Sequence, residues 1–198
     1  MTALFLSHAA RDEATRTLLP TAEVLRARGV LELGAGTGLA GLAAAAALHC
    51  DVTLTDLPET LNALAANVAR NPALAPRCRV TPLDWTRLDA ASLASARNAA
   101  APPALLLACD CVWLLALVAP FVAALDALAA HDAVILLVHQ SRSAAVDAAL
   151  WQALSTAHLL PPLPLGVDPV PLPQPPGAEA AAARIYLLRR QGRSDANS

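Results

Sequence analysis

The sequence predicts a single-domain α/β fold built on a doubly wound, mostly parallel sheet. Short apolar segments, several of them ending in glycine or an acid, alternate with longer segments rich in alanine and leucine. Apolar runs of about 4 to 8 residues are typical of strands buried on both faces, and their alternation with helices favours parallel pairing through right-handed crossovers. The chain has 198 residues, which is enough for one well-packed domain and too few for two of ordinary size.

The first half of the chain contains three candidate strands and two candidate helices. The strands are expected at 30–33, 51–56 and 78–85. One helix is expected over 38–48, where a run of alanines follows the glycines. The other begins near Pro58, a residue that suits the first turn of a helix, and ends at Asn71, which precedes Pro72.

The second half continues this alternation and then departs from it. Strands and helices are expected, in order, at 104–110, 114–130, 133–140 and 143–156. Eight of the sixteen residues in 161–176 are proline, which predicts a loop, and the alternating segment 183–190 predicts a last, antiparallel strand. The chain therefore divides into a short N-terminal segment, a domain with this proline-rich loop, and a polar tail, at 1–28, 29–190 and 191–198.

Composition and charge exclude several classes of function. The formal net charge is -2, so no overall field attracts nucleic acid or an anionic membrane. All basic residues are arginine, and the absence of lysine excludes P-loop phosphate binding and pyridoxal phosphate chemistry, which both need a lysine. The apolar, uncharged run from Cys111 to Leu125 is shorter than the ~20 residues of a membrane span. We expect a monomer without nucleic-acid or membrane partners.

The cysteines indicate reduced thiols inside the cell. The N-terminus has no basic segment before its apolar run, as a secretory signal would, so we expect a cytoplasmic protein, with the nucleus as the second compartment. Cys109 and Cys111 have no histidine close by in the sequence. We interpret them as parts of a buried strand and expect no metal site.

The segment VLELGAGTGLAG, residues 30–41, predicts a strand, a glycine turn and the start of a helix, which together bind a nucleoside or a phosphate. The sequence pattern of this segment is compatible with two cofactors. Gly36, Gly38 and Gly41 have the spacing of the dinucleotide fingerprint, whereas Glu32 followed by alternate glycines has that of a loop that binds S-adenosylmethionine. Asp56, twenty residues beyond Gly36, could bind a ribose diol in either case.

Two observations favour S-adenosylmethionine over a dinucleotide. The G-x-G-x-x-G pattern begins only at Gly36, two residues later than a dinucleotide site expects. Glu32 would repel a pyrophosphate but attract the aminoacyl ammonium of S-adenosylmethionine. In addition, the single tyrosine, Tyr186, without any lysine cannot form the Tyr/Lys relay of short-chain dehydrogenases. The dinucleotide reading remains the alternative.

Four motifs, VLELGAGTGLAG, TDLPE, LDW and CDCVW, follow one another along the chain. In this order and spacing they resemble those of the seven-strand, or class I, S-adenosylmethionine-dependent methyltransferases, over about residues 20–190. The chain is most similar to methyltransferase family 16, whose characterised members are mostly protein-lysine methyltransferases. The resemblance implies a Rossmann-like fold, S-adenosylmethionine as cofactor and a protein with an acceptor lysine as partner.

The resemblance also implies roles for individual residues. The aminoacyl part of the donor would be held by Glu32, Gly34, Ala35, Gly36 and Gly38. The ribose would be bound by Asp56, and the adenine would be lined by Leu57, Asp84 and Trp85. Cys109 and Asp110 would border the methionine end, and Trp113 would stand beside the acceptor channel. Asp110 and Trp113 are the candidate catalytic residues: Asp110 to orient the acceptor amine, Trp113 to shape an apolar channel around it.

Several of these residues also have a purely structural interpretation. Trp85 and Trp113 could belong to the core, Asp84 could form a turn, and Asp110 could cap the following helix. Conversely, His139, at the end of a predicted strand, could face the acceptor. At the level of function, a small-molecule N-methyltransferase and a non-catalytic methyltransferase-like binding module are the alternatives to a protein-lysine methyltransferase.

Two stretches depart from the family pattern. The family usually has a Trp-Pro pair before the first strand, and here LLPTAEVL, residues 18–25, contains only Pro20. The sixth strand of the family is expected to be replaced here by the proline-rich residues 161–176. Both stretches matter to the function because the first covers the donor in the family and the second lies close to where acceptors dock.

Overall fold

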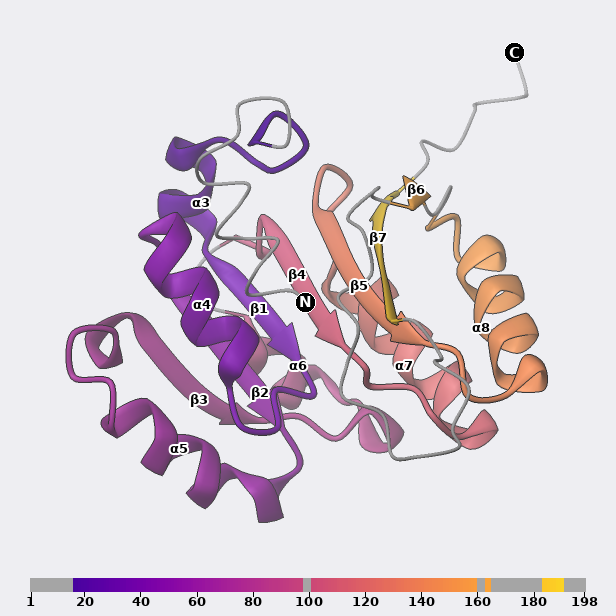
Figure 1. The fold of residues 1–198 in the computed structure, drawn as a ribbon, viewed down its shortest axis with the longest axis horizontal. Coiled ribbons are helices and arrows are strands. Elements are labelled where there is room, and N and C mark those ends of the chain that lie inside the picture. The colour runs from indigo at the N-terminus through magenta and orange to yellow at the C-terminus, as the bar shows by residue number, and fades with distance from the viewer. Residues whose placement is uncertain (1–15, 98–100, 160–162, 165–182, 191–198) are drawn as a thin grey trace, which may run out of the picture.

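The computed structural model describes residues 16–97, 101–159, 163–164 and 183–190. Its centre is a seven-stranded sheet with the order β3-β2-β1-β4-β5-β7-β6 (Figure 1). The strands are β1 (Val30–Leu33), β2 (Val52–Asp56), β3 (Cys78–Pro82), β4 (Leu105–Cys109), β5 (Val134–Gln140), β6 (Leu163–Pro164) and β7 (Ala183–Arg189).

The pairing confirms a doubly wound, mostly parallel sheet with an antiparallel last strand. β1 pairs in parallel with both β2 and β4, so that Val30 is in register with Val52 and with Leu105. β3 and β5 extend the parallel sheet on either side, and β7 pairs antiparallel with β5. The expectation for the sixth strand needs correction: β6 is present, reduced to two residues that pair with Leu187 and Tyr186 of β7. The rest of 161–176 lies outside the described residues.

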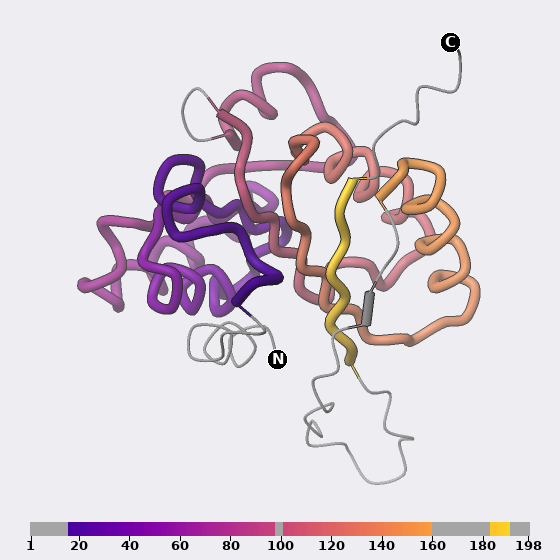
Figure 2. Tube along the Cα trace, turned by 90° about the horizontal axis from the view of Figure 1, so that it is seen from above, coloured from indigo at the N-terminus to yellow at the C-terminus, as the bar shows by residue number. Residues whose placement is uncertain are grey.

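Helices cover both faces of the sheet. Residues of α3 (Ala22–Arg28), α4 (Leu39–Leu48) and α5 (Leu61–Ala69) pack into one apolar cluster, on one face. Residues of α6 (Ala90–Ala96), α7 (Leu115–Leu128) and α8 (Ala144–Thr156) pack into a second cluster, on the other face. Figure 2 shows the sheet from above, between these two layers. Within the described ranges there are also three short 3₁₀ turns, namely η1 (Pro58–Thr60), η2 (Ala75–Arg77) and η3 (Trp85–Arg87).

The strand side chains explain the two clusters. Alternate residues of β1 point to opposite faces, so Val30 belongs to the first cluster whereas Leu31 and Leu33 belong to the second. Because both faces are covered, the central strands are apolar throughout, as in β4, where Leu105, Leu106 and Leu107 are fully buried. No helix in the described part of the chain is both long enough and apolar enough to cross a membrane.

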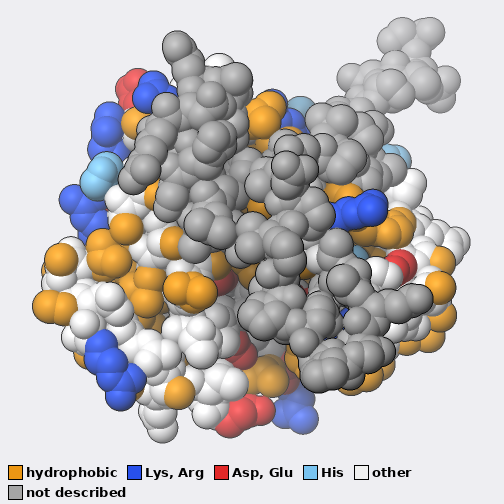
Figure 3. Space-filling model, viewed as in Figure 1, with side chains coloured by type: hydrophobic (Ala, Val, Ile, Leu, Met, Phe, Trp, Pro, Cys, Tyr) orange, Lys and Arg blue, Asp and Glu red, His pale blue; other side chains and the backbone are white. Residues whose placement is uncertain are grey.

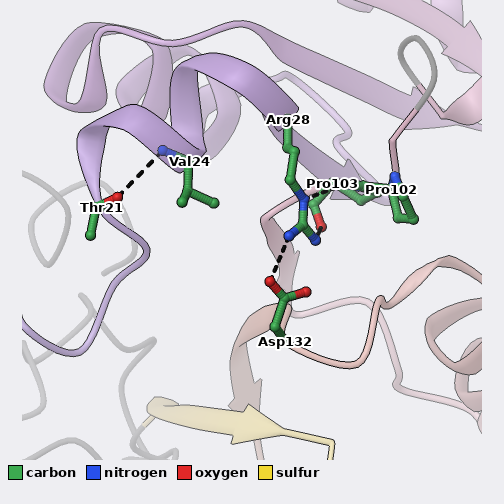
Figure 4. A network of polar contacts seen from close by, with 6 residues as sticks. All are labelled: Thr21, Val24, Arg28, Pro102, Pro103 and Asp132. Carbon is green, nitrogen blue, oxygen red and sulfur yellow. Dashed lines mark hydrogen bonds and ion pairs between the residues drawn. The ribbon is translucent and has the colours of Figure 1, made fainter.

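At the edge where the strands begin, Arg28 at the end of α3 ties three segments together (Figure 4). Its Nε donates to the carbonyl of Pro102 at 2.9 Å, and its Nη2 donates to that of Pro103 at 3.2 Å. Its Nη1 pairs with Asp132 at 2.6 Å, and this contact holds the pKa of Asp132 below its ordinary value. The two prolines precede β4 and Asp132 precedes β5, so this clamp fixes α3 against the central strands.

Candidate active site

A cavity of about 1080 Å³ opens at the other edge, where β1, β2 and β4 end. Acidic and hydrophobic side chains lie side by side at the lower centre of the molecule in Figure 3, where the parallel strands of Figure 1 end. The sheet grows toward β3 on one side of β1 and toward β5 on the other, so the cavity lies at the topological switch point, where open α/β sheets bind their ligands.

The glycine loop forms the floor of this cavity. Gly34, Gly36 and Gly38 have φ angles of 63°, 54° and 81°, a left-handed conformation that favours glycine. A Cβ on Gly34 would lie 3.1 Å from the sulfur of Cys111 and 3.2 Å from the indole of Trp85. Gly34 and Gly36 line the cavity together with Ala35, whereas Gly38 is the N-cap of α4 and lies outside the lining.

Glu32 is a buried acid in the wall of the cavity, with 2% of its surface exposed. Its Oε2 accepts a hydrogen bond of 2.9 Å from the backbone N–H of Gly41. Burial raises the pKa of Glu32 to about 8, and the nearby charge of Asp56 adds to this rise. A Cβ on residue 41 would lie 2.6 Å from Oε2, so Gly41 lets the helix backbone approach this carboxyl group.

Asp56 ends β2 and is held by two backbone donors. Its Oδ2 accepts from the N–H of Gly36 at 2.6 Å, and its Oδ1 accepts from the N–H of Leu57 at 2.7 Å. These bonds fix the carboxylate in the cavity wall and leave each oxygen with a second lone pair for a ligand hydroxyl. The side chain of Leu57 is exposed beside it and also lines the cavity.

Asp84 and Trp85 line the cavity, and both have structural partners too. Asp84 is the N-cap of η3 and accepts from the N–H and the hydroxyl of Thr86, which lower its pKa. The ring of Trp85 meets Phe121 in an edge contact with centroids 5.4 Å apart. Its indole nitrogen is buried and has no hydrogen-bond partner within the described ranges. Asp84 therefore forms a turn, and Trp85 joins the cavity to the core.

The segment after β4 differs from a continuous strand. β4 ends at Cys109, because Asp110 has a φ of 57° and leaves the extended conformation. The N–H of Asp110 donates to Val138 O at 2.8 Å, which fixes this turn to β5. The thiol of Cys111, beyond the strand, donates to Leu33 O at 3.1 Å, and burial raises its pKa. The expectation that both cysteines lie within the strand is thus wrong.

The mouth of the cavity is apolar and open. Trp113 and Leu114 line it, and each has 53% of its surface exposed. Asp110 lies beside them and does not cap α7, whose N-cap is Leu114. The structure thus brings all the predicted site residues except Gly38 to one cavity.

Arg142 lies outside the cavity lining but contacts Asp110, and it is not among the residues predicted from the sequence. Its Nη1 and Nη2 donate to the two carboxylate oxygens of Asp110, at 2.7 and 2.5 Å, and Nη2 also donates to Gln140 Oε1 at 3.0 Å. Arg142 follows β5 at the same sheet edge as Asp110, and this position was the signal available in the sequence.

His139 does not face the cavity. It is buried, with its Nε2 at 2.8 Å from Asp147 Oδ1 and its ring against that of Trp151. Asp147 also accepts a hydrogen bond from Ser141. The hypothesis that His139 contacts an acceptor is therefore not supported, and its contacts anchor the segment between β5 and α8.

The groups that line the cavity fit a nucleoside that carries a positive charge. Asp56 is placed for a diol, the glycine loop allows close approach of a ligand to the backbone, and Glu32 is a buried acid without a cationic partner among the described residues. A pyrophosphate would place two negative charges close to the carboxylate of Asp56 and would offer no cation to favour the ionisation of Glu32, which disfavours the dinucleotide alternative.

Comparisons with known proteins agree with this geometry. A family described as lysine methyltransferase matches residues 1–155. EEF1A lysine methyltransferase 3 of Mus musculus is 47% identical over 60 residues, which are 30% of this chain. The match spans only 25% of the length of that mouse protein.

Solved structures share the fold. A predicted O-methyltransferase, Atu636 from Agrobacterium tumefaciens, has a TM-score of 0.62 at 20% identity, over 98% of this chain and 82% of its own. The glycopeptide N-methyltransferase MtfA, solved in complex with sinefungin, has a TM-score of 0.60 at 13% identity, over 94% of both chains. The family match covers most of the sequence, and the fold agrees with it. The chain therefore belongs to the lysine methyltransferase family.

Proposed function

We propose that the chain is an S-adenosylmethionine-dependent methyltransferase, and that it acts on a lysine side chain that a protein substrate presents at the mouth of the cavity. The observation that carries the proposal is the half-exposed apolar rim of Trp113 and Leu114 beside the carboxylate of Asp110. An open rim suits a long side chain that reaches in from a macromolecule, whereas a small acceptor needs a closed pocket to bury most of its surface. The mouse relative, by its name a lysine methyltransferase, supports the same substrate class.

We assign the donor site to the residues that gather on the cavity floor and wall. Glu32 would pair with the aminoacyl ammonium, with Gly34, Ala35, Gly36 and Cys109 around the aminoacyl part. Gly38 would act indirectly, by holding the loop at the start of α4. Asp56 would accept from the ribose hydroxyls, and Leu57, Asp84 and Trp85 would line the adenine.

S-adenosylmethionine supplies an electrophilic methyl group on a sulfonium sulfur. With this donor bound, an acceptor nitrogen held in line would form a carbon–nitrogen bond while the carbon–sulfur bond breaks, and the electron pair of the broken bond would stay on sulfur. The acceptor lysine would give up a proton to water before the attack, so the methylated nitrogen would form as a cationic ammonium. Little acid–base chemistry is needed, so the work of the protein is to align the acceptor and exclude water.

Asp110 and Trp113 are the residues placed for this work. The left-handed turn at Asp110 sets its carboxylate at the cavity mouth, where it can accept a hydrogen bond from the acceptor amine and direct the nitrogen lone pair. The indole of Trp113 gives the channel an apolar wall, which favours the uncharged amine through desolvation. Its π face would also stabilise the cationic product.

Donor binding is the first test. Calorimetric titration is expected to show that the purified chain binds S-adenosylmethionine and not NAD. Asp56→Ala should abolish this binding because the ribose loses its acceptor. Asp51→Ala is the matched control, since Asp51 is an exposed acid that precedes the same strand at the opposite edge of the sheet. Equal loss in both variants would contradict the assignment of Asp56.

Methyl transfer is the second test. The chain is incubated with a soluble cell extract and S-adenosylmethionine labelled in the methyl group, and the proteins are hydrolysed and analysed for methyl-lysines. Asp110→Ala is expected to lower the rate about 100-fold through misalignment while donor binding persists. Labelled small molecules without methyl-lysine would favour a small-molecule N-methyltransferase, and donor binding without any product would favour a non-catalytic module.

A further inference from the structure

The pair between Arg142 and Asp110 lies at the point where the acceptor would enter. It is bidentate, with contacts of 2.7 and 2.5 Å, and the side chains keep 43% and 37% of their surface exposed. Fork-like contacts of this kind fix the orientation of a carboxylate. Arg142 therefore determines both the direction and the net charge of the group that the acceptor amine meets.

The segment that carries Arg142 is anchored on both sides. Ser141, the residue before it, donates to Asp147, which lies in the first turn of α8. Asp147 also bonds to the buried ring of His139 in β5. Gln140 accepts from the guanidinium itself. These contacts fix the backbone from which the side chain of Arg142 extends, so the fold at the end of β5 holds the guanidinium next to Asp110.

The charge of Asp110 presents a chemical problem that Arg142 can solve. A lone carboxylate beside an amine favours the ammonium form, and an ammonium has no lone pair with which to attack a methyl group. A bidentate guanidinium cancels this charge but uses only one lone pair of each carboxylate oxygen. The second lone pair remains free to accept a hydrogen bond from a neutral amine.

We propose that Arg142 is a positioning residue that neutralises and orients Asp110, so that the acceptor amine meets the donor in its uncharged form. The inference rests on the proposed function, because it takes an amine as the acceptor. It adds a residue outside the cavity lining to the residues that govern the reaction.

The other charges around the cavity leave this role to Arg142. Glu32 from β1, Asp56 from β2, Glu59 from η1 and Asp84 before η3 are all acids that line the cavity, and Arg87 lies 4.0 Å from Asp84. The thiols of Cys109 and Cys111 border it near β4. Arg142 is thus the described cation that contacts Asp110, and without it the mouth would become more negative.

The test is the pH dependence of methyl-lysine formation in the same cell extract, as initial rates at limiting extract from pH 6.5 to 10. In Arg142→Gln, the pH at which the rate reaches half of its maximum should increase by about one unit, because the uncancelled carboxylate of Asp110 holds the proton on the amine. At pH 7 the rate of this variant should be about tenfold below that of the wild type. Above pH 9.5 the two rates should become similar. Arg142→Lys, which keeps the charge, should have a pH profile close to that of the wild type.

Two comparisons make the result decisive. Arg26→Gln removes an exposed arginine of α3, remote from the cavity, and should leave the profile unchanged. A fall of the same factor at every pH in Arg142→Gln, or an unshifted profile, would overturn the inference and leave the proposed function intact. Absence of methyl-lysine with the wild-type chain would refute the proposed function itself, and the role of Arg142 with it.

Discussion

Glu32 is a carboxyl group that folding places in an unfavourable environment. It is buried between the end of β1 and the start of α4. Its Oε2 accepts a hydrogen bond from the backbone N–H of Gly41, which is too weak a compensation for the lost water. The pKa of about 8 means that the group carries a proton at neutral pH until a cation arrives. A ligand ammonium would supply the charge that makes ionisation favourable.

This burial predicts a specific pH dependence of stability. The folded pKa of Glu32 lies above its ordinary value of 4.5, so between pH 4.5 and 8 the folded chain keeps a proton that the unfolded chain has lost. The free energy of unfolding should therefore fall with rising pH across this window, by on the order of 5 kcal/mol, and the contribution should level off above pH 8. Urea unfolding of wild type and Glu32→Gln at several pH values measures the effect.

The amide in Glu32→Gln cannot ionise, so this variant should gain stability relative to the wild type as the pH rises. Glu59→Gln is the control, because that glutamate is exposed and its replacement should leave the slope unchanged. Parallel curves for wild type and Glu32→Gln would show that Glu32 ionises normally in the folded chain.

At the scale of elements, the clamp around Arg28 predicts how α3 is held. Arg28→Lys would keep a charge near Asp132 but lose the two carbonyl contacts with Pro102 and Pro103, and should lower the free energy of unfolding by about 1–2 kcal/mol. Asp132→Asn should cost less, below about 1 kcal/mol, because this carboxylate is largely exposed. Thermal or urea unfolding of both variants measures which one loses more free energy of unfolding. A larger loss in Asp132→Asn would show that the ion pair stabilises the clamp more than the two carbonyl contacts do.

The elements also show what the sequence could reveal. The strand expected at 30–33 coincides with β1, because a short run between two glycines that is apolar except for Glu32 has few alternatives. α6 was not predicted: of its residues only Ala96 is buried, so no apolar stripe marks it, and it begins at a capping box formed by Asp89 and Ser92. α3 has only Leu25 buried and was missed for the same reason.

The site was predictable where a residue type carries its own chemistry and less so where a contact depends on the fold. Glu32 precedes the glycine loop by two residues and Asp56 ends an expected strand, and the structure brings both to the cavity, as predicted. The pairing of Asp110 with Arg142, 32 positions later, requires β5 to lie next to β4, and the left-handed turn at Asp110 has no glycine to mark it. Such partners are visible only in the folded chain.

At the scale of the whole molecule, the two edges of the sheet differ in what they do. The edge where strands begin holds the Arg28 clamp, and the edge where they end holds the cavity. A ligand that binds only the second edge should slow hydrogen exchange there, because binding suppresses the local openings of what it touches.

We therefore expect S-adenosylmethionine to protect 34–40, 56–60 and 84–87 from hydrogen exchange and to leave 101–105 and 131–134 unchanged. Exchange followed by mass spectrometry measures this pattern, and Asp56→Ala with the same ligand serves as control because it should show no protection. Equal protection at both edges would mean that exchange proceeds through unfolding of the whole domain and not through local opening.

The position of β7 has a consequence for the order in which the chain is made. β7 is the last described strand in the sequence, yet it lies between β5 and β6 and pairs with β5 along seven residues (Figures 1 and 2). Until residues 183–189 leave the ribosome, the nascent chain has β5 as an unprotected apolar edge, open to pairing with other chains. Residues 183–189 must therefore be synthesised before the sheet closes, and a chaperone that shields β5 during this interval would raise the yield of folded protein.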